Sequence, residues 1–110
     1  MKIAILNCLQ ANEVCAGCSC LKALAARTRH FARYEGQDVE LAAFARCNGC
    51  GAGLDEGFLE KLDRMVSEGA QVVHLGVCTV RRETHTECPT MTQAAEYLQA
   101  RGLEVHRGTH

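Results

Sequence analysis

The chain has 110 residues, of which 47% are hydrophobic and 23% charged, with a formal net charge of −1 at pH 7. This composition excludes a disordered chain and predicts one folded domain over residues 1–110. The near-neutral charge and the absence of tryptophan argue against nucleic acid and membrane surfaces as partners. No apolar run approaches the roughly 18 residues that a membrane span needs.

Four short apolar runs predict β-strands. They begin at residues 2, 39, 71 and 103, so successive starts are 37, 32 and 32 residues apart. This spacing is typical of strand–helix units joined by right-handed crossovers. We therefore expect an α/β fold, a small open parallel four-stranded sheet flanked by helices, with the flavodoxin-like strand order 2-1-3-4. The expected strands are Lys2–Asn7, Val39–Arg46, Gln71–Val77 and Leu103–Arg107.

Three stretches between these strands carry apolar residues at helical spacing. The apolar stripes run over residues 21–32, 58–66 and 91–98, and Gly102 closes the third helix. Ser19 is the expected cap of the first helix. Gly69 stands where the C-terminal glycine of the second helix belongs, and Pro89 precedes the third helix, where its missing N–H does no harm.

Eight cysteines are the unusual feature of the composition. The apolar run at the N-terminus is too short for a secretory signal, so we expect a cytoplasmic protein in a reducing compartment. Disulfide frameworks are rare there, and several cysteines more often indicate metal binding or redox chemistry. Any single cysteine could instead be a small buried hydrophobic residue.

The cysteines gather at the ends of expected strands and the starts of expected helices. Because the carboxyl ends of parallel strands meet at one edge of a sheet, where α/β proteins bind ligands, we expect one site there. Helix N-termini also stabilise thiolates, the form of cysteine that binds metals. The residues that follow strands are Cys8, Cys47, Cys78 and His110, and those near helix starts are Cys15, Cys18, Cys20, Cys50 and Cys88.

There are two C-x-x-C pairs, Cys15–Cys18 and Cys47–Cys50, and Cys47 comes 29 positions after Cys18. A C-x-x-C pair lets two sulfurs hold one ion, but this separation lies outside the usual zinc-ribbon spacing. Arg46 precedes Cys47, and Arg81 and Arg82 follow three and four positions after Cys78. They either offset the charge of bound thiolates or are solvated surface residues.

Several short motifs occur in order along nearly the whole chain. They are the strand Lys2–Ile5 leading to Cys8, the segment Cys15–Ala23, Cys47-Asn48-Gly49-Cys50, His74-Leu75-x-x-Cys78, Cys88-Pro89 and Gly108-Thr109-His110. In this order and spacing they resemble the CGGC-domain family of small cysteine-rich proteins. The resemblance implies metal binding, with zinc as the expected metal, and it implies no particular reaction.

Two positions depart from the family pattern. Asn48-Gly49 stands where the family has two glycines, and asparagine tolerates the left-handed backbone better than most residues. Cys18 is additional to the pattern, so we do not rank it as a primary ligand.

We expect four cysteines, Cys8, Cys47, Cys50 and Cys78, to be the first ligands, because they follow neighbouring strands and four sulfurs satisfy tetrahedral zinc. Further candidates are Cys15, Cys20, Cys88 and His110. Seven or eight thiols exceed the need of one zinc ion, so two metals or a cluster are also compatible with the sequence. His74 lies within a strand, where a histidine satisfied in the core is favoured over one that contacts and supports a metal ligand.

Our leading hypothesis is therefore a zinc-binding protein whose role is structural, sensing or catalytic. The alternative is an iron–sulfur protein or a thiol–disulfide redox protein that uses Cys47 and Cys50. A third hypothesis is a carrier that transfers a soft metal to another molecule. The C-x5-R loop of cysteine phosphatases, the P-loop and the dinucleotide-binding pattern are all absent, and no motif identifies a protein partner.

Overall fold

The computed structural model describes all 110 residues and contains one four-stranded parallel sheet. The strand order is β2-β1-β3-β4, and all three neighbouring pairs are parallel. Both the α/β class and the predicted order are confirmed. The strands are β1 (Lys2–Asn7), β2 (Glu40–Arg46), β3 (Val72–Leu75) and β4 (Glu104–Arg107).

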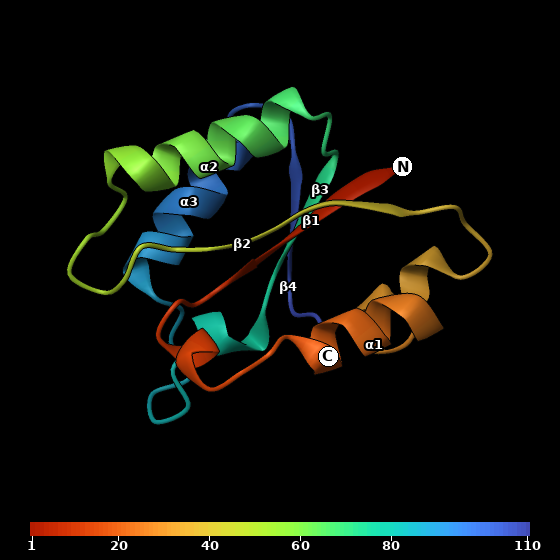
Figure 1. Ribbon diagram of the computed structural model, residues 1–110, viewed down its shortest axis with the longest axis horizontal. Coiled ribbons are helices and arrows are strands. Elements are labelled where there is room, and N and C mark those ends of the chain that lie inside the picture. Colours follow the sequence, from red (N-terminus) through yellow and green to blue (C-terminus); the bar gives the residue numbers. More distant parts are fainter.

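Helices cover both faces of the sheet (Figure 1). The helices α2 (Glu56–Ser67) and α3 (Pro89–Gln99) pack on one face, and α1 (Cys18–Ala26) with the 3-10 helix η2 (Arg29–Tyr34) packs on the other. Because side chains alternate along a strand, β1 contributes to both cores. Its Ala4 and Leu6 belong to the α2–α3 core and its Ile3 and Ile5 to the α1–η2 core.

The second and third helices follow their sequence signals closely. The Asp55 side chain accepts a hydrogen bond from the Phe58 N–H at 2.8 Å and caps α2. Beyond its last turn, Gly69 adopts a φ of 88°, which favours glycine. Pro89 is the first residue of α3. Phe58, Leu62 and Met65 of α2 are fully buried against the sheet.

The first helix is shorter than predicted and begins with another cap. The N-cap residue is Gly17, with a φ of 77°, and Ser19 lies inside the helix. The expected continuation to residue 32 is wrong, because α1 ends at Ala26 and Arg27 takes the left-handed conformation. Thr28 is then extended, and η2 follows in a new direction. This break brings Phe31 and Tyr34 into the core.

Loops at the edge where the four strands end, called the carboxyl edge here, contain two short 3-10 helices. These are η1 (Ala11–Glu13), after β1, and η3 (Val77–Thr79), after β3. The third strand ends at Leu75, two residues earlier than predicted. None of the helices has both the length and the apolar character needed to cross a membrane.

Candidate functional site

The cysteine-bearing segments meet at the carboxyl edge of the sheet. Cys8 follows β1 directly, Cys47 follows β2, and Cys78 lies in η3 just beyond β3. His110 comes three residues after the end of β4. The predicted placement of these residues at strand ends is therefore confirmed, although which of them bind an ion is a separate question.

A cavity of about 400 Å³ opens at this edge, and we call it the thiol cavity. Its walls come from the loops after β1 and β3, from α1, and from the segment after β4. Three cysteines lie on these walls together with Arg82 and other residues. The lining is Cys15, Cys20, Cys78, Asn7, Asn12, Ala11, Val14, Val77, Val80, Arg82 and His110.

The sulfur atoms of Cys20 and Cys78 are held by polar contacts. The Cys20 thiol is buried and lies 3.1 Å from the Thr109 hydroxyl oxygen. The Cys78 sulfur accepts a hydrogen bond from the Cys8 N–H at 3.2 Å. Both sulfurs therefore have fixed positions, whereas Cys15 is exposed at the rim and accepts from the N–H of Gly17 at 3.4 Å.

Burial raises the pKa of the Cys78 thiol, even though the Cys8 N–H favours the thiolate. The nearby Cys8 and Cys20 thiols raise that pKa further, because neighbouring negative charge disfavours ionisation. Cys78 is therefore protonated at neutral pH in the metal-free protein. Any ligand that needs its thiolate must displace that proton.

Two buried side-chain atoms of the protein lack a hydrogen-bond partner, and both belong to residues of the thiol cavity. They are the Asn7 amide oxygen and the Asn12 amide nitrogen. Buried polar groups are nearly always paired, so unpaired ones require an explanation. One is an acceptor and the other a donor, and both belong to residues that line the cavity together with the three thiols.

Asn7 lies against Gly76, which follows β3. A Cβ added at residue 76 would overlap the Asn7 amide oxygen and would come within 3.2 Å of the Cys78 sulfur. The Asn7 amide nitrogen lies 3.9 Å from the Cys20 sulfur. The Asn7 side chain therefore lies beside the buried Cys20 thiol, and Gly76 leaves the room that this side chain occupies.

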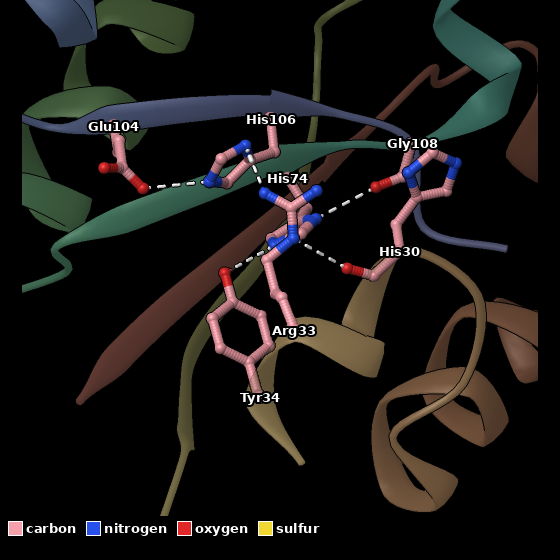
Figure 2. A network of polar contacts seen from close by, with 7 residues as sticks. All are labelled: His30, Arg33, Tyr34, His74, Glu104, His106 and Gly108. Atoms are coloured by element: carbon pink, nitrogen blue, oxygen red, sulfur yellow. Dashed lines mark hydrogen bonds and ion pairs between the residues drawn. The ribbon is translucent and has the colours of Figure 1, made fainter. Parts of the chain in front are cut away.

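The segment after β4 is anchored by His74, as Figure 2 shows. His74 is fully buried, and its Nδ1 donates to the Gly108 carbonyl oxygen at 2.9 Å. A carbonyl can only accept, so His74 Nε2 is the ring atom that accepts from the Tyr34 hydroxyl at 2.8 Å. The interpretation of His74 as a satisfied core histidine is confirmed. It fixes Gly108 and, through the chain, the Thr109 hydroxyl beside Cys20.

The imidazole of His74 is neutral at physiological pH. Burial lowers its pKa from 6.5 to about 4, and the Gly108 carbonyl only partly opposes this shift. Next to His74, on the more exposed side, Arg33 contacts Nδ1 of His106 at 2.6 Å, and His106 Nε2 lies 2.9 Å from a Glu104 carboxylate oxygen (Figure 2). His74 therefore positions the backbone and does not exchange protons with solvent near pH 7.

Cys47 and Cys50 lie outside the thiol cavity, in the loop after β2. The buried Cys47 sulfur accepts from the Leu9 N–H at 3.4 Å, and the exposed Cys50 thiol donates to Gln10 at 3.3 Å. The expectation that Cys50 stands at a helix start is wrong, because α2 begins at Glu56. The loop after Cys50 turns through residues 51–54 before the Asp55 cap, which separates the thiols from the helix N-terminus.

Asn48 is expected to tolerate a left-handed backbone in the C-x-x-C loop, but it does not adopt one. Gly49 carries the positive φ, 105°. The Asn48 side chain instead donates to Asp55 at 2.9 Å and accepts from the Lys61 ammonium at 2.7 Å. Asn48 thus ties the C-x-x-C loop to α2.

The remaining cysteines are separated from each other. Cys88 is the N-cap residue of α3, and its N–H donates to the Thr79 carbonyl at 2.9 Å. Cys18 is the exposed first residue of α1 and does not line the thiol cavity. Sequence reasoning missed Asn7, Asn12 and Thr109, since nothing in their local sequence indicates contact with thiols.

The donor set of the thiol cavity suits a soft metal ion, because thiolates and imidazoles are the preferred ligands of zinc. The distances between these donors do not suit a bound metal ion. No group of three or more His, Cys, Asp or Glu side chains lies close enough together to hold a metal ion. Metal binding in the thiol cavity would therefore require its side chains to move toward one another.

The family model of the CGGC domain matches residues 2–110. The match spans the sheet, the three α-helices and all eight cysteines. No curated protein and no solved structure matches the chain.

Proposed function

Because this chain belongs to the CGGC-domain family, a cysteine-rich family, we propose that it binds a soft metal ion, zinc first, through thiolates of the thiol cavity. The observation that supports this proposal is that Cys15, Cys20 and Cys78 line one cavity at the carboxyl edge. Cys15 and Cys20 come from the stretch around the start of α1, and Cys78 comes from η3 beyond β3, so two segments far apart in the sequence bring their thiols to one cavity.

The proposed ligands differ in how firmly they are placed. Cys20 is buried in α1 and Cys78 is half-buried in η3, so both would act as fixed ligands. Cys15 lies on an exposed loop and would close over the ion. His110, also on the cavity wall, is the candidate for a fourth ligand. Three thiolates and one imidazole complete a tetrahedral zinc site.

The ligand set expected from strand ends alone, which includes Cys8, Cys47 and Cys50, stays a prediction. The contacts favour the thiol cavity over that set, because Cys47 and Cys50 belong to the separate loop after β2. A site closed by four protein ligands would have a structural or sensing role. If His110 does not coordinate the ion, one coordination position stays open and would let the ion act as a Lewis acid.

The test is a zinc titration of reduced, metal-free protein against a chromophoric chelator, with single Cys→Ser variants. We expect about one tightly bound zinc per chain and a release of protons on binding, because Cys78 starts as a thiol. Cys20→Ser and Cys78→Ser should each weaken binding by roughly 100-fold or more, since loss of a contact that only supports a ligand already costs roughly 10–100-fold.

Cys18→Ser is the matched control, since Cys18 is exposed and lies outside the cavity. Its affinity should equal that of the unmodified chain. Absence of zinc binding, or equal losses in Cys18→Ser and Cys20→Ser, would refute the proposed site. Iron with acid-labile sulfide in anaerobically purified protein would instead identify an iron–sulfur protein.

Thiol–disulfide exchange at Cys47 and Cys50 is the second candidate function. It is favoured by the pairing of a buried thiol, which accepts the Leu9 N–H, with an exposed one in the same loop. The two thiols would form a disulfide and pass two electrons and two protons to a substrate disulfide. Mass spectrometry after incubation with oxidised glutathione tests this: loss of two hydrogens should require both cysteines. Persistence of that loss in Cys50→Ser would exclude the pair.

A further inference from the structure

A second pocket, of about 560 Å³, lies beside the thiol cavity, and every charged residue that lines it is basic. It is lined by three arginines and two histidines, and we call it the basic pocket. Val77, Val80 and Arg82 line both hollows, so the two are neighbours on the same edge. The basic residues are His30, Arg81, Arg82, His85 and Arg107.

Two of the three arginines have no carboxylate partner. Neither Arg81 nor Arg82 forms an ion pair, whereas Arg107 is held by Glu87 at 2.9 Å. Glu83, in the same loop, pairs with neither. The basic pocket therefore holds an excess of positive charge that the protein itself does not neutralise.

The loop that carries Arg81, Arg82 and His85 is held in place by the backbone. Val80 and Glu87 pair as an antiparallel bridge, and the Arg81 N–H donates to the Thr86 carbonyl at 2.9 Å. The His85 N–H closes the loop on the Arg81 carbonyl at 2.8 Å. A closed loop of this kind keeps like charges near one another, which costs stability unless a counter-charge binds.

Part of the lining of the basic pocket is backbone at two glycines. Gly76 and Gly108 both line it, and the His30 ring occupies the space where a Gly108 side chain would project. The Gly76 and Gly108 N–H groups already donate to the Leu6 and Leu75 carbonyls, so these glycines contribute room for a bound group and not hydrogen-bond donors. A pocket of this volume is also large enough for a small molecule, and not only for an ion.

We propose that the basic pocket binds the oxyanion of a phosphate group, presented by a small molecule or as free phosphate. The planar guanidinium fork matches the tetrahedral oxygens of phosphate in two parallel hydrogen bonds. Arg82 places this anion next to the thiol cavity, so one ligand can contact both. The proposal goes beyond metal binding and does not depend on it.

The competing explanation is that Arg81 and Arg82 only offset the charge of thiolates in the neighbouring cavity. That explanation predicts no saturable phosphate binding to the reduced, metal-free protein. It also predicts that removing the arginines affects zinc affinity alone.

The experiment is an amide-NMR titration of the reduced, metal-free chain with inorganic phosphate at constant ionic strength, balanced with sodium chloride. Saturable shifts are expected at the Gly76 and Gly108 amides. Arg81→Gln and Arg82→Gln should each weaken phosphate binding by about tenfold or more, since each removes a charge-assisted contact. The phosphate affinity of Arg82→Lys should lie between those of the unmodified chain and Arg82→Gln, because lysine keeps the charge and loses the planar guanidinium fork.

Arg64→Gln is the matched control, because Arg64 lies exposed on α2 and the charge change is the same. Phosphate shifts that fail to saturate, or that Arg64→Gln weakens as much as Arg82→Gln, would overturn the proposal. A parallel titration with phenyl phosphate distinguishes the sources: tighter binding indicates an ester, and equal binding indicates free phosphate. Zinc binding is measured without phosphate, so either proposal can fail alone.

Discussion

The contact between Gly76 and Asn7 allows a stringent test of how the thiol cavity is built. Gly76 has a φ of −61° and a ψ of 156°, which alanine adopts without backbone strain. Alanine at residue 76 would nevertheless overlap the Asn7 amide oxygen and approach Asn7 Cγ to 3.0 Å. Any loss of stability in Gly76→Ala must therefore come from crowding.

The expected magnitude follows from two opposing effects. Overpacking of a buried site costs about 1–3 kcal/mol, while replacing glycine by alanine at a compatible φ stabilises by about 0.4–1 kcal/mol through the unfolded chain. We expect Gly76→Ala to lower the free energy of unfolding by about 1–2 kcal/mol. In an Asn7→Ala background the overlap disappears, and the same substitution should be close to neutral.

Urea unfolding of the four proteins in this double-mutant cycle measures the coupling between residues 7 and 76. Gly51→Ala is the control, because residue 51 has no atoms within 4 Å of an added Cβ and lacks a positive φ. It should change stability by less than about 0.5 kcal/mol. An equal cost of Gly76→Ala with and without the Asn7 side chain would refute this account.

Three further predictions concern the buried His74–Tyr34 pair and the cap of α2. His74 is neutral in the folded protein and has a pKa of about 4, so its contribution to the free energy of unfolding is complete above pH 6.5 and is lost as pH falls from 6.5 to 4. Urea unfolding at pH 7 and pH 4 should show a loss of about 3 kcal/mol. His74→Leu should flatten this pH dependence of stability, and an unchanged pH dependence in that variant would contradict the prediction. Tyr34→Phe removes the hydrogen bond to His74 Nε2 and should lower the free energy of unfolding by about 1–3 kcal/mol. Thermal unfolding measures this loss, and an unaltered unfolding midpoint would contradict it. Asp55→Ala removes the α2 cap and the contact with Asn48 and should cost about 1–2 kcal/mol; Asp55→Asn, which can still cap, should recover most of it, and no recovery would argue against capping.

The sheet could be predicted because its information is local and repetitive. Apolar runs such as Lys2–Asn7 mark strands, and their regular spacing leaves parallel crossovers as the simplest connection. The end of α1 could not be predicted, because the apolar stripe continues to Ala32. After Arg27 turns the chain, the last apolar residues of the stripe belong to η2. One hydrophobic pattern is therefore shared by two different local structures.

The candidate site could be predicted only in outline. Strand ends correctly place Cys8 and Cys78 at one edge, since this follows from topology alone. The distinction between Cys20, inside the cavity, and Cys47, outside it, depends on how loops fold back over the edge. Long-range contacts such as Cys20 with Thr109, 89 residues apart, leave no trace in local sequence.

The anchoring of Gly108 by His74 has a practical consequence for handling the protein. His110 lines the thiol cavity, while Met1 lies at the opposite edge of the sheet, where β1 begins (Figure 1). A polyhistidine tag appended after His110 would deliver a series of extra imidazoles to the mouth of the cavity, and metal counts would then report the tag. The same tag placed before Met1 keeps its imidazoles a full strand length away from the thiols.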